Sequence, residues 1–177
     1  MFDVLKRLLV FLFEVVRVPF DVLRGTTHRV YNVSADVDAP KAVTWSVISA
    51  HKITLEGALP ITLDTAPDPE RPGVYTGTLS FAQRVLPIAY RIVEEHPEQA
   101  MLLAIIREES APEICPGSNY VCLSSIHGDD KTSRIDLRYE LTHEKFSSRL
   151  LMPLSALQSA GRLKYNAELR AGSANQS

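Results

Sequence analysis

A strictly alternating segment in the last third of the chain constrains the fold more than any other feature of the sequence. Across residues 132–143, charged side chains alternate with apolar ones. The charged residues are Arg134, Asp136, Arg138 and Glu140, and the apolar residues are Ile135, Leu137, Tyr139 and Leu141. This period of two predicts an antiparallel strand with one face in water and the other in the core.

A segment with helical periodicity follows this strand directly, over about residues 144–170. The apolar stripe of the expected helix comprises Phe146, Leu150, Leu154, Leu157, Gly161 and Tyr165. We expect Gly161 to face the sheet or a cavity, where a glycine permits close approach. A long strand that leads into a long C-terminal helix favours a curved sheet wrapped around that helix. Such an architecture usually encloses an apolar cavity.

Further strands precede this pair. The sequence predicts strands at 28–37, 74–81, 86–96, 101–106 and 119–127, and an interrupted extended segment at 52–63. The last of these strands should form a hairpin with the alternating strand. A short helix over 41–49 is expected after Asp38 as its N-cap, with Ala42, Trp45 and Ile48 on its buried face.

The expected strand 86–96 carries the first candidates for a functional site. Tyr90 and Ile92 share its apolar face, and Glu94 continues that face. An inward carboxylate is costly to bury unless it is paired, and burial raises its pKa. Alternatively, Glu94 lies at the strand end and reaches water. Tyr90 and Tyr139 each point inward from a strand, where they either hydrogen-bond a ligand from an apolar wall or belong to the core.

Composition and motifs exclude several classes of function. The chain has 177 residues with a net charge of −2, and its lysines and arginines are scattered, which argues against a basic nucleic-acid-binding face. The sequence contains no glycine-rich phosphate loop, no GxSxG motif and no HExxH motif. The five histidines occur singly, and the spacing of Cys115 and Cys122 matches no zinc or redox motif. We therefore expect no cofactor, no metal site and no nucleic-acid partner.

The first 23 residues are apolar except for one narrow charged stripe, which predicts an amphipathic helix. The stripe consists of Asp3, Lys6, Arg7, Glu14, Arg17 and Asp21. Two interpretations stay open: the helix lies on a membrane surface, or it packs on protein, either its own domain or a second copy in a homo-oligomer. Glu14 and Arg17 oppose a membrane span, and no small-residue cleavage site indicates a signal peptide. We expect a cytoplasmic protein, which is peripheral at the membrane under the first interpretation.

These observations divide the chain into three parts. Residues 1–25 form the amphipathic helix, residues 26–171 form one folded domain, and residues 172–177 form a small, polar and mobile tail. A domain of this length can bury a sizeable core without disulfide bonds.

Three strings of sequence, taken in order, resemble the START-like or SRPBCC superfamily, which includes the polyketide cyclase/dehydrase and Bet v 1-like proteins. They are VSADVDAPKAVTW at 33–45, PIAYRIVEEHP at 87–97, and TSRIDLRY at 132–139 followed by the helical segment 150–164. The resemblance covers about residues 29–169. It implies an α+β helix-grip fold, in which a curved antiparallel sheet wraps around the long C-terminal helix with a hydrophobic cavity between them. The N-terminal helix is an addition to that pattern.

The resemblance implies no single activity, because members of the superfamily bind lipids, sterols or hormones, cyclise polyketides or act as co-chaperones. We expect this chain to bind a hydrophobic small molecule or lipid in the internal cavity. The expected cavity lining is Tyr90, Ile92, Leu137, Tyr139, Leu150 and Leu154. Two alternatives stay open: an enzyme of the cyclase/dehydrase kind, in which Tyr90, Glu94 or His127 transfers protons, and an interaction protein with a filled core.

Overall fold

The computed structural model of the chain describes residues 9, 13, 28–114, 119–142 and 146–174, and of residues 146–154 it describes the backbone alone. The strands are β1 (His28–Val37), β2 (Lys52–Leu55), β3 (Ile61–Pro67), β4 (Val74–Phe81), β5 (Arg84–His96), β6 (Ala100–Ile105), β7 (Asn119–Gly128) and β8 (Ser133–Thr142). The helices are α2 (Lys41–Ile48), the short 3-10 helix η1 (Arg107–Glu109) and α3 (Phe146–Ala174).

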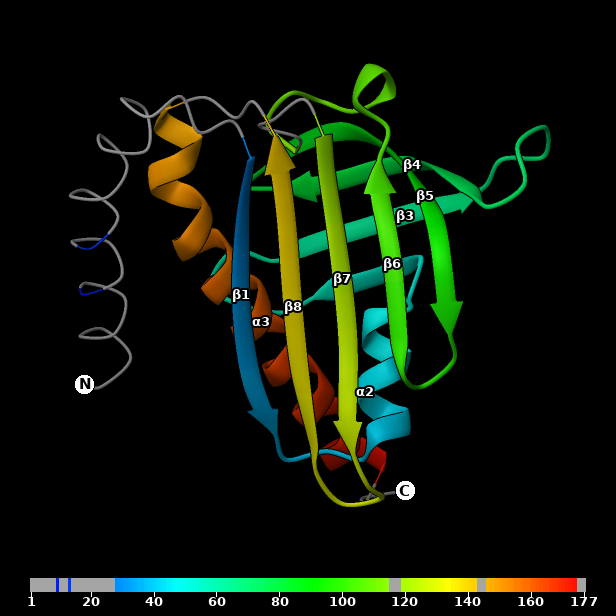
Figure 1. Ribbon diagram of the computed structural model, residues 1–177. Helices are drawn as coiled ribbons and strands as arrows, with labels where there is room; N and C mark the ends of the chain where they lie inside the picture. The colour runs from blue at the N-terminus through cyan, green and yellow to red at the C-terminus, as the bar shows by residue number, and fades with distance from the viewer. Residues whose placement is uncertain (1–8, 10–12, 14–27, 115–118, 143–145, 175–177) are drawn as a thin grey trace.

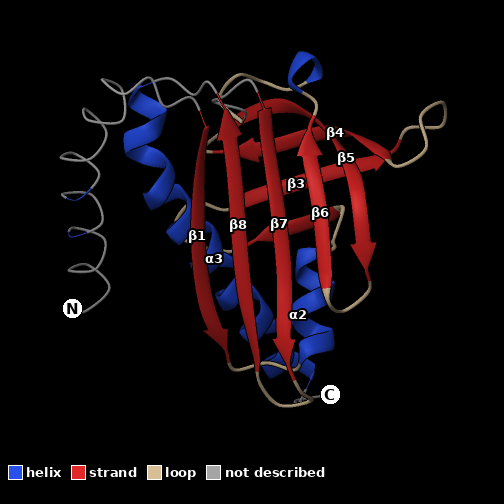
Figure 2. Ribbon diagram, in the orientation of Figure 1, coloured by secondary structure: helices blue, strands red, loops and turns tan. Residues whose placement is uncertain are grey.

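The eight strands form one antiparallel sheet in the order β1-β8-β7-β6-β5-β4-β3-β2. The sheet curves so strongly that β3 and β4 run across the direction of β1, β8 and β7, and α3 lies along its concave side (Figures 1 and 2). The two helices α2 and α3 contact each other on that side. This arrangement confirms the predicted α+β helix-grip fold.

The β7–β8 hairpin follows the alternation that the sequence predicted. Ile135 and Leu141 are completely buried on the concave face, whereas Arg134 and Arg138 are exposed on the convex face. The pairing of β8 with β1 brings Tyr139 opposite Tyr31, so the first strand of the chain completes the same buried layer. The core of the domain lies between this layer and α3.

The face of α3 that packs on the sheet is lined by alanines. Ala156, Ala160 and Ala167 are at most 2 % exposed and belong to the main core. Gly161 and Tyr165, which we expected on the buried stripe, are exposed, so the prediction that Gly161 faces the sheet is wrong. Small side chains allow the helix to approach the sheet closely, and a pattern weighted by large apolar residues does not reveal such a face.

The buried face of α2 also differs from the predicted stripe. Its buried residues are Thr44 and Val47. Thr44 tolerates burial because its hydroxyl lies 2.8 Å from Ser133 Oγ and is hydrogen-bonded to it. The helix begins where the sequence predicted, but Pro40 rather than Asp38 occupies the N-cap position.

The predictions for the two ends of the chain are only partly covered by the structure. The predicted N-terminal helix lies outside the described residues, apart from Leu9 and Phe13, which are both exposed. Within the described part of the chain, no helix is long and apolar enough to cross a membrane. At the other end, α3 continues to Ala174, so the first residues of the expected tail are helical.

Candidate functional site

The concave face of the sheet differs between its two halves. Along β1 and β8, most inward side chains are buried beneath the helices. Across β3 to β6, many inward side chains are apolar but remain partly exposed. We call this set the inner wall, and it comprises Leu63, Leu79, Phe81, Leu86, Ile92, Leu103 and Ile105. A concave apolar surface that the protein covers only in part is suited to a hydrophobic ligand.

A polar cluster of His51, Thr65 and Tyr90 lies beside the inner wall, where Tyr90 is directly opposite Ile105. The Nδ1 atom of His51 is 2.7 Å from the Tyr90 hydroxyl. That hydroxyl is 3.0 Å from Thr65 Oγ1, which in turn donates a hydrogen bond of 2.9 Å to the carbonyl oxygen of His51. The three residues are therefore joined in a closed ring of hydrogen bonds.

Aromatic stacking supports this cluster. The rings of His51 and Tyr75 stack with centroids 3.9 Å apart and planes 14° apart, and Tyr75 stacks on Tyr90 at 5.5 Å and 8°. Gly77 lies between Thr65 and β5 on the same row, and a Cβ atom there would collide with a backbone oxygen of β3. Position 77 therefore requires glycine for β4 to pair this closely with β3.

Burial sets the protonation of the cluster. Burial lowers the pKa of His51 below its ordinary value, and the nearby charge of Glu95 opposes this shift. Burial also raises the pKa of Tyr90, against the effect of its hydrogen bond with Thr65. Both groups are therefore neutral at neutral pH, and the cluster offers uncharged donors and acceptors.

A β-bulge in β5 changes the faces on which its two glutamates lie. The pairing with β6 shifts between Ile92 and Glu94, so that Glu94 lies opposite Leu102 on the convex face. Glu94 is exposed, and its Oε1 atom is 2.6 Å from His96 Nε2. Of the two placements that the sequence allowed, the structure shows the one in water. The expectation that Glu94 continues the inward face is wrong, and Glu95 takes the inward position instead.

Four of the predicted lining residues lie on the concave face, but in different surroundings. Tyr90 belongs to the polar cluster and Ile92 to the inner wall. Leu137 and Tyr139 are 2 % and 6 % exposed, in the packed core with the alanines of α3. Burial raises the pKa of the Tyr139 hydroxyl, and it raises the pKa of the neighbouring Cys122 thiol to about 11.

The remaining predicted site residues lie elsewhere or outside the description. His127 is exposed on the convex face, where its Nε2 atom is 3.6 Å from the Asp136 carboxylate. Leu150 and Leu154 fall in the part of α3 whose side chains are not described. A proton-transfer role at the inner wall would therefore rest on Tyr90 and not on Glu94 or His127.

Sequence reasoning missed His51, Thr65 and Tyr75 as partners of Tyr90. The members of the hydrogen-bonded ring are 14, 25 and 39 positions apart in the chain, so no local motif connects them. Their contact depends on the register of β3, β4 and β5. The only hint in the sequence was that Thr65 follows Leu63 by two positions, so that both side chains lie on the same face of the strand. Within the described residues, no group of three His, Cys, Asp or Glu side chains could hold a metal ion.

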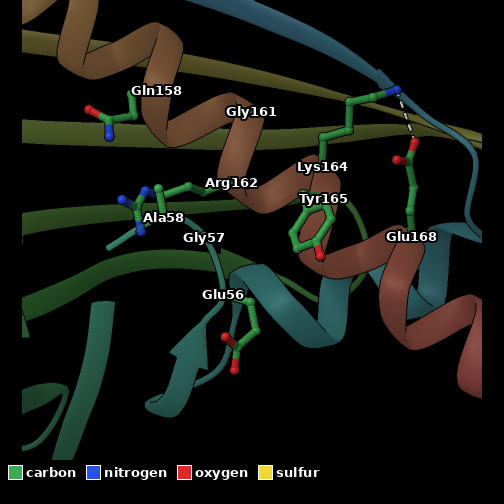
Figure 3. A pocket seen from close by; sticks show the side chains of 9 residues that line it. All are labelled: Glu56, Gly57, Ala58, Gln158, Gly161, Arg162, Lys164, Tyr165 and Glu168. Atoms are coloured by element: carbon green, nitrogen blue, oxygen red, sulfur yellow. Dashed lines mark ion pairs between the residues drawn. The ribbon is translucent and has the colours of Figure 1, made fainter. Parts of the chain in front are cut away.

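A second hollow, which we call the outer groove, lies between the exposed side of α3 and the loop after β2, with a volume of about 650 Å³ (Figure 3). Its lining residues are Glu56, Gly57, Ala58, Gln158, Gly161, Arg162, Lys164, Tyr165 and Glu168. Lys164 Nζ pairs with Glu168 at 2.9 Å, and Arg162 Nη1 donates to the carbonyl oxygen of Leu59 at 2.6 Å. Four of its nine lining residues are charged, so this groove presents a mixed surface, whereas the inner wall is apolar.

Comparison with known proteins identifies the fold. No protein-family model and no curated protein matches the sequence. The Zhui aromatase/cyclase of Streptomyces sp. R1128 matches with 12% identity and a TM-score of 0.56, over 81% of this chain and 95% of its own. The structure of Ara h 8.0201 matches with 13% identity and a TM-score of 0.59, over 82% and 99%. The polyketide cyclase-like protein Cgl2372 of Corynebacterium glutamicum matches with 12% identity and a TM-score of 0.55, over 82% and 94%.

These similarities confirm, at the level of the fold, the resemblance to START-like helix-grip proteins that the sequence suggested. The likeness extends over 95% and 99% of the length of the first two of these structures.

Proposed function

We propose that this domain binds a hydrophobic small molecule or lipid between the inner wall and α3. The observation that carries the proposal is the partly exposed apolar wall beside a neutral polar cluster. Removing the apolar surface of a ligand from water contributes about 25 cal/mol per Å². The cluster supplies the few polar groups that fix the orientation of such a ligand.

The comparisons support the class of ligand. One similar structure is named as an aromatase/cyclase and another as a polyketide cyclase-like protein. We infer binding rather than catalysis, because two of the three residues that the sequence suggested for proton transfer, Glu94 and His127, are exposed on the convex face.

We also infer that residues 1–23 hold the domain at a membrane surface. The narrow charged stripe of this segment leaves a wide aliphatic and phenylalanine-rich face that is favourable to bury among lipid headgroups. Apolar molecules are poorly soluble in water, so a binding domain held at a membrane can exchange its ligand with the bilayer directly.

The test uses two neighbouring leucines of β6 that lie on opposite faces of the sheet. Leu103 is opposite Ile92 on the inner wall, and Leu102 is opposite Glu94 on the convex face. Both leucines are partly exposed, but Leu103 also packs against the main core, so the folding of each tryptophan variant is checked. The neutral fluorescent probe N-phenyl-1-naphthylamine is titrated into the wild type and both variants, and circular dichroism checks that each variant is folded.

We expect saturable binding of the probe at one site in the wild type. Leu103→Trp should weaken that binding about tenfold or more, a cost of at least about 1.4 kcal/mol, because the indole occupies the space of the ligand. Leu102→Trp should leave the affinity unchanged. Absence of saturable binding, or an equal loss in the two variants, would refute binding at the inner wall.

A further inference from the structure

The number of hydrogen bonds in the polar cluster equals the number of polar side-chain hydrogens that are available to form them. In its neutral state the cluster has three polar side-chain hydrogens, one each on Thr65, Tyr90 and the His51 ring. Its three contacts are those between His51 Nδ1 and Tyr90, between Tyr90 and Thr65, and between Thr65 and the His51 carbonyl oxygen. Each contact requires one hydrogen, so all three hydrogens must be used within the ring.

The direction of each hydrogen bond follows from its fixed end. The carbonyl oxygen of His51 can only accept, so Thr65 donates its one hydrogen there. Thr65 must then accept from Tyr90, and Tyr90 must accept from His51 Nδ1. If Tyr90 instead donated to His51, one of the two contacts of Thr65 would bring two oxygens together at 2.9 or 3.0 Å with no hydrogen between them. His51 therefore carries its hydrogen on Nδ1, and its Nε2 atom carries a lone pair.

The surroundings of His51 turn this nitrogen into a site for a ligand. The backbone N–H of Thr65 donates to the His51 carbonyl oxygen at 2.9 Å, which extends the β2–β3 pairing to His51. The side chain of His51 therefore lies on the same face of the sheet as the buried Ile53, two residues later. The imidazole is partly exposed and lies flat on Tyr75. Within the described residues, Nε2 has no hydrogen-bond partner, and the charged group that acts on the ring is Glu95.

We propose that His51 Nε2 is the hydrogen-bond acceptor of the ligand site, and that the site therefore selects apolar molecules that carry a hydroxyl group. The proposal rests on the proposed function, because it takes the molecule bound at the inner wall as the donor to Nε2. A phenol or alcohol can donate a hydrogen bond to this lone pair. An ether or carbonyl oxygen has no hydrogen to donate, so it forms no hydrogen bond with Nε2. Tyr90 and Thr65 are positioning residues, since they fix which nitrogen of His51 accepts.

The test compares two probes that differ in one hydrogen-bond donor. Isothermal titration calorimetry measures the affinity of the wild type for 2-naphthol and for 2-methoxynaphthalene. One neutral hydrogen bond corresponds to a preference of about two- to tenfold for 2-naphthol. In His51→Asn, the side-chain amide can still donate toward Tyr90, but no atom replaces Nε2. We expect this variant to bind both probes equally, because it has lost the acceptor that distinguishes them.

A second measurement needs neither a variant nor a ligand. A long-range ¹H–¹⁵N correlation spectrum of the wild type distinguishes the two neutral forms of a histidine, and we expect the form with hydrogen on Nδ1 at His51. The form with hydrogen on Nε2 would overturn the proposal. Equal binding of both probes by the wild type would also overturn it, but would leave the proposed function standing. If neither probe binds, the proposed function itself fails and the inference fails with it.

Discussion

Ala160 and Gly161 are neighbours on α3 with opposite surroundings. Ala160 is 2 % exposed and packs in the core, where a larger side chain has no room. Gly161 faces the outer groove, and a Cβ atom built on it would meet nothing within 4 Å. The close approach of α3 to the sheet therefore depends on the alanine and not on the glycine.

Substitutions at these two positions should change stability in opposite directions. Gly161→Ala should raise the free energy of unfolding by about 1 kcal/mol, because alanine has the higher helix propensity. Ala160→Leu should lower it by about 1–3 kcal/mol, because the added atoms overpack the core. Denaturation by urea measures both values. Destabilisation by Gly161→Ala would mean that this face of α3 is covered in the folded protein.

Single residues also mark the limit of what the sequence reveals about the site. Tyr90 could be predicted to point inward because it alternates with apolar neighbours in its own strand. His51 could not be connected to it, because their contact requires β3, β4 and β5 to pair in one register, which depends on the close approach of β4 to β3 at Gly77. Such a relation appears only when four segments are placed together.

At the level of elements, predictability depended on whether a pattern was interrupted. β8 keeps an unbroken alternation, so both of its faces were predicted correctly. β5 contains a bulge after Ile92, so that Glu95 faces inward in place of Glu94. Because these two neighbours are both glutamate, the order of polar and apolar residues in the sequence does not reveal which of them faces inward. The predicted stripe of α3 was wrong at Gly161 and Tyr165 for another reason, since the buried alanines carry little hydrophobic signal compared with a residue such as Tyr165.

The N-terminal segment is the element that carries the membrane proposal. Flotation of liposomes with the full chain and with a chain that starts at Gly25 tests it. We expect the full chain alone to float, because the apolar face of residues 1–23 provides most of the binding. Salt should weaken flotation only slightly, since acidic residues offset most of the basic ones in this segment. Equal partitioning of the two chains would exclude the segment as an anchor, and resistance to carbonate extraction would show a membrane span instead.

At the scale of the whole molecule, the two halves of the sheet have different roles. The β1–β8 half packs tightly on α3 and carries much of the stability of the fold. The β3–β6 half keeps apolar side chains partly exposed on a concave face, where complete packing would have stabilised the protein further. This division is the physical basis of the proposed function, because an apolar wall left partly uncovered can gain stability from a ligand.

The most direct test of this account is to locate a bound hydrophobic molecule by NMR. Intermolecular nuclear Overhauser effects are recorded between N-phenyl-1-naphthylamine and protein labelled at its Ile, Leu and Ala methyl groups. We expect contacts with the methyl groups of Ile92 and Leu103 on the inner wall, and none with Leu102 on the convex face. Contacts with Ala58 in the outer groove, in place of those with the inner wall, would contradict it.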